Sequence, residues 1–274
     1  MPFDAGLLIA IRRRLNEICD AAQEPSPAAG NPFAAVRDHS EPGQLAKTLA
    51  AWGARAEPAV PELVRLLAVR PMAAAPVLAA IGQPTLECVA ALRRVAETAD
   101  NREAVHARLA AARALRSLTG DAGALLAAVQ YGLTTPSKDP DDRAAAAEAA
   151  TELPDHADLL TPLLLQALQA IPAPTPSLPA HQARLKLGRA LWLFTGQPEH
   201  VIAVLRTTLD LAGEDFTAWT VATAAELAAD LATGLGPDSG PAARELVAGL
   251  EAALADPVSA GAAARALKSP YFRK

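Results

Sequence analysis

The sequence predicts an all-α protein: a right-handed α-α superhelix (solenoid) of about six helical hairpins with a capping helix at each end. Hydrophobic residues make up 51% of the 274 residues but aromatic residues only 4%, so the apolar content is mostly Ala, Leu and Val. Apolar residues recur at the i, i+3, i+4, i+7 spacing of helices, whereas the alternation typical of strands is absent. Regular Pro and Gly breaks indicate a stack of small units.

One phrase occurs twice, as RALRSLTGD at 113–121 and RALWLFTGQ at 189–197, an offset of 76. Half of this offset, 38, is typical of helical-hairpin repeats, and four glycines follow that spacing: Gly82, Gly120, Gly196 and Gly234. We predict that these glycines end helices in the left-handed conformation and that Asp121 caps the next helix. The alternative, a phosphate-binding turn at a helix N-terminus, would not recur wherever the fold needs a turn.

Each repeat is expected to contain one helix, a break at Gly or Pro, and a second helix. The predicted pairs are 43–52/58–70, 72–81/84–97, 102–118/121–133, 141–152/155–170, 179–194/197–212 and 216–233/238–255. Pro154 replaces the glycine break in one unit, and the proline-rich segment 172–179 is an insertion. We therefore expect three regions: residues 1–42 with an N-terminal cap helix and a Pro-rich excursion, the array 43–257, and a C-terminal cap and tail at 258–274.

The second helices of the pairs carry the clearest apolar stripes. Examples are Val60, Leu63, Leu66 and Leu67; Leu125, Leu126, Val129 and Leu133; and Val201, Val204, Leu205 and Leu209. The cap helix at 3–23 would use Leu7, Leu8, Ile11, Leu15 and Ile18, the closing cap helix is 258–268, and 24–42 is expected to be irregular.

Bulk properties favour a cytoplasmic protein that binds neither membrane nor nucleic acid. Cys19 and Cys88 are isolated and form no CxxC motif, so buried thiols are expected. The N-terminal basic triplet follows the apolar stretch, the wrong order for a secretion signal, and no segment has the roughly 18 apolar residues of a membrane span. The net charge of −5 lacks the basic excess that phosphate-backbone binding requires.

Charge is unevenly distributed along the chain. Residues 93–116 contain six arginines and three acidic residues, whereas residues 210–256 contain nine acidic residues and one arginine, Arg244. These runs are solvated helix faces, or they form a polarised surface that orients a partner by charge.

The stretch AWGARAEPAVPELVRLL resembles the HEAT-repeat consensus, in which a helix ends at Gly and a Pro-containing turn leads into a second, Leu-rich helix. ALRSLTGD and ALWLFTGQPEHVIAVL resemble divergent HEAT and lyase-type HEAT-like repeats of actinobacterial proteins, and the resemblance covers most of 43–255. It implies an armadillo-like α-solenoid and a non-enzymatic scaffold or adaptor without metal or cofactor. In such solenoids the second helices line the concave face, which implies protein-partner contacts at Arg94, Gln130, Tyr131, Gln166, Gln169 and Arg206.

Two other functions stay open for a HEAT-like chain. One is a HEAT-like DNA glycosylase, whose family holds a damaged base near tryptophans; here Trp52 and Trp192 lie near helix breaks, where core packing is the expected role, and Trp219 is the third. The other is a bilin-lyase-like or other ligand-handling protein. HEAT-like iron hydroxylases use paired His-Glu dipeptides, which this chain lacks, so its five histidines are expected to be solvated turn residues. The oligomeric state is left open.

Overall fold

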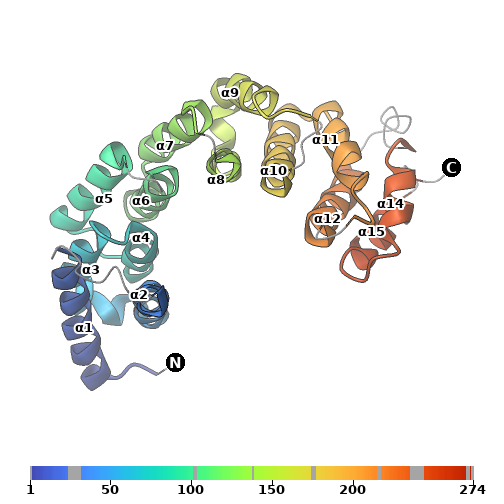
Figure 1. Cartoon of the computed structure of the whole chain (residues 1–274). Helices are drawn as coiled ribbons and strands as arrows, with labels where there is room; N and C mark the ends of the chain where they lie inside the picture. The colour runs from blue at the N-terminus through green and yellow to red at the C-terminus, as the bar shows by residue number, and fades with distance from the viewer. Residues whose placement is uncertain are drawn as a thin grey trace. The chain divides into compact units, whose positions relative to one another are not determined.

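The computed structural model describes residues 2–23, 32–100, 104–137, 139–173, 177–214, 217–234, 244–269 and 272. Within these ranges the chain is all-helical and has no strand, as the sequence predicts (Figure 1). None of the helices described is long and apolar enough to cross a membrane. The chain divides into two compact units, Met1–Val129 and Gln130–Lys274.

The N-terminal unit contains two layers of helices. Its elements are α1 (Ala5–Gln23), α2 (Pro32–Trp52), the 3-10 helix η1 (Gly53–Ala59), α3 (Val60–Leu67), α4 (Pro71–Ile81), α5 (Leu86–Thr98), α6 (Ala104–Thr119) and the start of α7 (Gly123–Thr134). Helix α4 packs between α2 and α6, and α3 packs between α1 and α5. Contacts of α1 with α2, α3 with α4 and α5 with α6 join the layers (Figure 1).

The C-terminal unit is built around α10. After the end of α7 it contains α8 (Pro140–Ala150), η2 (Pro154–His156), α9 (Ala157–Gln169), α10 (Leu178–Thr195), α11 (Glu199–Leu209), α12 (Ala218–Gly234), α14 (Val247–Ala253) and α15 (Ala260–Leu267). Helix α10 packs against α8, α9, α11 and α12, and α12 in turn packs against α14 and α15. Helices α8, α10 and α12 are each the first helix of a predicted pair.

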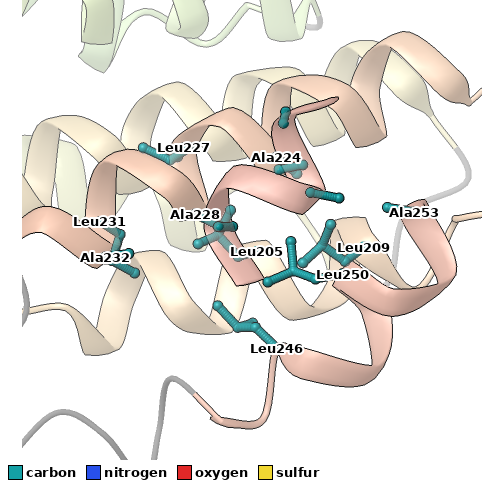
Figure 2. Packing of buried hydrophobic residues seen from close by; sticks show 14 of the residues in the cluster. Leu205, Leu209, Ala224, Leu227, Ala228, Leu231, Ala232, Leu246, Leu250 and Ala253 are labelled. Carbon is teal, nitrogen blue, oxygen red and sulfur yellow. The ribbon is translucent and has the colours of Figure 1, made fainter. Parts of the chain in front are cut away.

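Small residues allow the first helices to approach closely. The buried face of α8 consists of alanines, among them Ala146, Ala147 and Ala150, each without exposed surface. The hydrophobic cluster to which α11, α12 and α14 contribute also contains larger side chains. Figure 2 shows Leu205, Leu209, Leu227, Leu231 and Leu250 gathered within it. The predicted stripe Val201, Val204, Leu205 and Leu209 is at most 1% exposed, which confirms its assignment to the core.

The glycine breaks are helix ends, as predicted. Gly82, Gly120 and Gly196 have φ of 74°, 77° and 67°, the left-handed conformation that glycine adopts without steric cost. Gly53, at the break after α2, has the same left-handed conformation, with φ of 55°. Gly234 is the last residue of α12, and the segment that follows it lies outside the described residues.

The threonine of the repeated phrase makes the same two hydrogen bonds in both copies. Thr119 Oγ1 donates to the carbonyl four residues earlier at 2.8 Å and accepts from the amide two residues later at 3.2 Å. For Thr195 the two distances are 2.8 and 3.1 Å. In the first copy Asp121 Oδ1 then accepts from the Gly123 amide at 2.8 Å. The phrase is therefore a helix-to-helix turn.

A second repeated contact was missed at the level of sequence. Arg108 and Arg184 each lie five residues before the phrase and are 76 residues apart. Arg108 Nε donates to the Ala99 carbonyl at 2.8 Å, and Arg184 donates through one terminal nitrogen to the Ile171 carbonyl at 2.7 Å. Both carbonyls follow the end of a second helix. Burial lowers the pKa of Arg184, yet its guanidinium still binds the segment between α9 and α10.

The predicted irregular segment 24–42 is wrong over residues 32–42, which form the first half of α2. Proline fits the first position of a helix because its fixed φ is helical and its missing N–H has no partner there, and α2 begins at Pro32. Residues 24–31 lie outside the described part. The predicted helix 58–70 is divided into η1 and α3. Within the predicted helix 238–255, Arg244 is helical and Val247–Ala253 form α14, with a turn at 245–246 between them, while 238–243 are not described.

Candidate functional site

The six residues predicted to contact a partner lie on four helices of the two units. Arg94 is exposed on α5, Gln130 and Tyr131 are half-buried on α7, Gln166 and Gln169 are exposed on α9, and Arg206 is exposed on α11. The two glutamines of α9 are three residues apart and share one face of that helix. Arg94 lies in the N-terminal unit, apart from the other five residues, which belong to the C-terminal unit.

Arg206 already has an anionic partner. Its NH1 donates to Glu245 Oε2 at 3.0 Å, and both side chains are slightly more than half exposed. An ion pair so open to water contributes at most about 1 kcal/mol. A binding partner would therefore have to compete with Glu245 for this guanidinium.

The three tryptophans occupy different environments. Trp52 is 6% exposed, donates from Nε1 to the Pro2 carbonyl at 3.1 Å and meets the Phe3 ring edge-on at 5.3 Å. Trp192 is half-buried against the core cluster of the C-terminal unit. These two confirm the expected core packing, whereas Trp219 is 76% exposed.

The expectation that all histidines are solvated turn residues is wrong for His106, which is half-buried within α6, and for His181. His181 lies within α10, is 3% exposed, and its Nδ1 is 3.3 Å from Thr208 Oγ1 of α11. The free-energy cost of burying an imidazole is lower when a hydroxyl lies within hydrogen-bond distance, because the ring nitrogen beside it keeps a hydrogen-bond partner. The side chain of His39 lies outside the described residues. Over the described ranges no three His, Cys, Asp or Glu residues are placed to hold a metal ion.

Both cysteines are free thiols buried in the N-terminal unit, as predicted. Cys19 is 1% exposed and Cys88 has no exposed surface. Burial raises the pKa of both thiols above the usual value. Because the thiolate is the reactive form, neither cysteine is set up as a nucleophile.

Charged contacts join α1 to its neighbours in the same unit. Arg14 donates to the two carboxylate oxygens of Glu41 at 2.7 Å each and to Glu17 at 2.9 Å. These bonds raise the pKa of Arg14, and the Arg14 guanidinium lowers the pKa of Glu41. Arg12 donates to Glu62 Oε1 at 2.9 Å. These contacts hold α1 against α2 and α3.

A groove with charged walls lies between α10 and α12 in the C-terminal unit. Its lining residues are Leu185, Lys186 and Arg189 from α10 and Thr223, Glu226, Leu227 and Asp230 from α12. Leu185 and Leu227 are 1% and 5% exposed, so they form an apolar floor. The charged side chains stand above this floor, cationic on α10 and anionic on α12.

The groove continues into one exposed stripe on each helix. On α12 the stripe is Trp219, Thr223, Glu226 and Asp230, with spacings of 4, 3 and 4 that keep them on one face. On α10 the stripe is Gln182, Lys186, Arg189 and Leu193, at the same spacings and 37 residues earlier. Gln182 Nε2 donates to Thr220 Oγ1 at 3.5 Å, which links the N-terminal ends of the two helices.

The cations of this surface are paired, but one carboxylate is not. Lys186 Nζ is 2.8 Å from Glu148 on α8, and Arg189 is 3.9 Å from Asp230 across the groove. The side chains of Trp219 and Glu226 make no hydrogen bond, ion pair or ring contact with any other residue that the structure describes. The outer face of α12 thus presents an indole and a carboxylate that are open to a partner.

The sequence carries a signal for this stripe, although it forms no catalytic motif. Trp219, Glu226 and Asp230 are at positions i, i+7 and i+11 of one predicted helix, and an aromatic residue in line with acids is unusual for a core face. The links Glu148–Lys186 and Gln182–Thr220 both span 38 residues, the repeat length. Residues 38 positions apart on neighbouring helices therefore touch.

No protein-family model matches the chain, and comparisons with curated proteins and with solved structures find no match. The resemblance to HEAT repeats therefore depends on the phrases in the sequence.

Proposed function

We propose that the protein is a non-enzymatic HEAT-like α-solenoid scaffold or adaptor, and that its protein partner binds along the exposed stripes of α10 and α12. The observation that carries this proposal is Trp219, 76% exposed and in line with Glu226 and Asp230 beside a groove with an apolar floor. Tryptophan and charged residues around an apolar centre are the usual composition of binding hot spots.

Three repeated features support the solenoid part of the proposal. The Thr-Gly turn recurs with the same hydrogen bonds, Arg108 and Arg184 bind equivalent linker carbonyls, and residues 38 positions apart on neighbouring helices touch through side chains. Within each unit the first helices of the predicted pairs stack on one another: α2 on α4 and α4 on α6 in one unit, and α8 on α10 and α10 on α12 in the other. Such nearest-neighbour contacts are characteristic of repeat arrays.

The second-helix residues named from the resemblance have weaker support as a binding surface. Arg206 is engaged by Glu245, Gln130 and Tyr131 are half-buried, and Arg94 belongs to the other unit. By contrast, the stripes of α10 and α12 adjoin one groove, and they combine exposed apolar, cationic and anionic side chains. We therefore place the partner on the first helices of the C-terminal unit.

Affinity capture from cytosolic extract of the source cells, followed by mass spectrometry, distinguishes these surfaces. We expect the double variant W219A/E226K to lose at least about 90% of the partner captured by the wild type, because it removes the exposed ring and reverses the open charge. The matched double variant R94A/R206A should retain the partner. Circular dichroism and the melting temperature should change little in both, since all four residues are exposed.

Two results would refute this proposal. If the wild type recovers no protein beyond those captured by an unrelated bait, the scaffold function is wrong. If R94A/R206A loses the partner and W219A/E226K retains it, the partner binds on the second helices instead.

A further inference from the structure

We infer that the exposed stripe of α12 recognises a basic segment of the partner, with one Arg or Lys at Glu226 and Asp230 and a second over the ring of Trp219. This inference rests on the proposed function and specifies the chemistry of the segment that the stripe binds.

The first step concerns the charges available at the stripe. Glu226 is exposed and its side chain has no partner among the residues described, so its carboxylate is open to an incoming cation. Arg189 and Asp230 are 3.9 Å apart with side chains 56% and 62% exposed, so this ion pair is weak and leaves the Asp230 carboxylate largely in solvent, where it adds to the negative charge beside Glu226. Lys186 also lines the groove, but its ammonium group is paired with Glu148 on α8. This pairing reduces the electrostatic repulsion between Lys186 and a cation bound at Glu226.

The second step concerns Trp219. Its ring is 76% exposed, and an indole face is the best aromatic partner for a guanidinium or ammonium group. Trp219 and Glu226 are seven residues apart on one helix face, a distance of about 10 Å along the axis. A segment in the polyproline II conformation has three residues per turn and rises about 3.1 Å per residue, so two cations at i and i+3 lie on one side of it and span this distance.

The third step concerns the charge around the groove. Residues 130–274 contain 11 Lys and Arg against 17 Asp and Glu, so the C-terminal unit attracts basic segments and repels acidic ones. This acidic excess is part of the uneven charge visible in the sequence. Charge of this kind raises association rates and selects the orientation of the partner more than it adds affinity.

Selection from a random library of 12-residue peptides on the immobilised full-length protein tests the inference without knowledge of the partner. We expect enrichment of peptides with two basic residues three positions apart. The best of them should bind the E226Q variant about fivefold more weakly, the upper range for one exposed ion pair, and the E226K variant more weakly still. The matched variant E199Q, an exposed carboxylate on α11, should bind like the wild type.

Fluorine NMR of protein labelled with 5-fluorotryptophan then locates the peptide, because the chain has only three tryptophans. The resonance of Trp219, assigned with W219F, should shift on titration, while those of Trp52 and Trp192 stay in place. Enrichment of acidic or uncharged peptides would overturn the inference, as would equal binding to wild type and E226K. A Trp219 signal that moves with protein concentration alone would assign the stripe to a second copy of the chain and also overturn it.

The two proposals fail separately. If a partner is captured through Trp219 but its bound segment is acidic or uncharged, the scaffold function stands and the basic-segment inference is wrong. If no partner is captured, the scaffold function itself is wrong.

Discussion

Replacing Leu250 by alanine is expected to lower the free energy of unfolding by about 3 kcal/mol, within the range for truncating a fully buried leucine. Leu250 lies on α14 with no exposed surface, and Figure 2 shows it beside Leu209 of α11 within the core cluster. The truncation leaves a cavity where α11, α12 and α14 converge. Urea denaturation followed by circular dichroism measures the loss.

Leu254 provides the matched control, since it lies four residues further along the chain and is 42% exposed. The same leucine-to-alanine change there should cost less than about 1 kcal/mol, because a large part of the side chain stays in contact with water in the folded state and its truncation leaves no enclosed cavity. Equal effects of the two substitutions would contradict the packing of α14 against α11.

Replacing Gly249 by alanine is expected to destabilise the protein by about 2 kcal/mol, although alanine is the better helix former. A Cβ atom at this position would lie 2.7 Å from Leu209 Cβ and 3.5 Å from the Leu209 carbonyl carbon. Neither is the end of a flexible chain, so α14 and α11 must move apart. A lower urea midpoint would report this overpacking.

Gly261→Ala is the control for that substitution. Gly261 lies in α15, and a Cβ atom there would meet nothing within 4 Å. The exchange should therefore stabilise the protein by about 0.5–1 kcal/mol, the usual gain from removing a glycine from a helix. The close approach of α14 to α11 is wrong if G249A is as stable as G261A.

Local signals in the sequence were sufficient for the all-helical class and for the positions of most helices. Stripes such as Val201 to Leu209 mark buried helix faces because helical periodicity and burial have the same physical origin. The Thr-Gly phrase marks helix ends because only glycine adopts positive φ without strain. Residues 32–42 were missed because their prolines and polar residues resemble a loop, although α2 begins at a proline and continues through Pro42.

The candidate site was less accessible to sequence reasoning. Which polar residues of a helix pair with one another depends on the packing of its neighbours, so Arg206 looked available until Glu245 was found beside it. His181 looked like a surface residue because its partner, Thr208, is 27 residues away. The helical spacing of Trp219, Glu226 and Asp230 can be read from the sequence. The exposure of this stripe cannot, because it depends on which face of α12 packs against α10 and its other neighbours.

Site-specific photocrosslinking in the source cells measures most directly where a partner binds. A photoreactive amino acid at Thr223, an exposed position in the wall of the α10–α12 groove, is compared with the same residue at Gln166, an exposed position on α9. Binding on the first helices of the C-terminal unit predicts a discrete protein adduct at position 223 and none at 166. An adduct at 166 alone, or no adduct at either position, would contradict it.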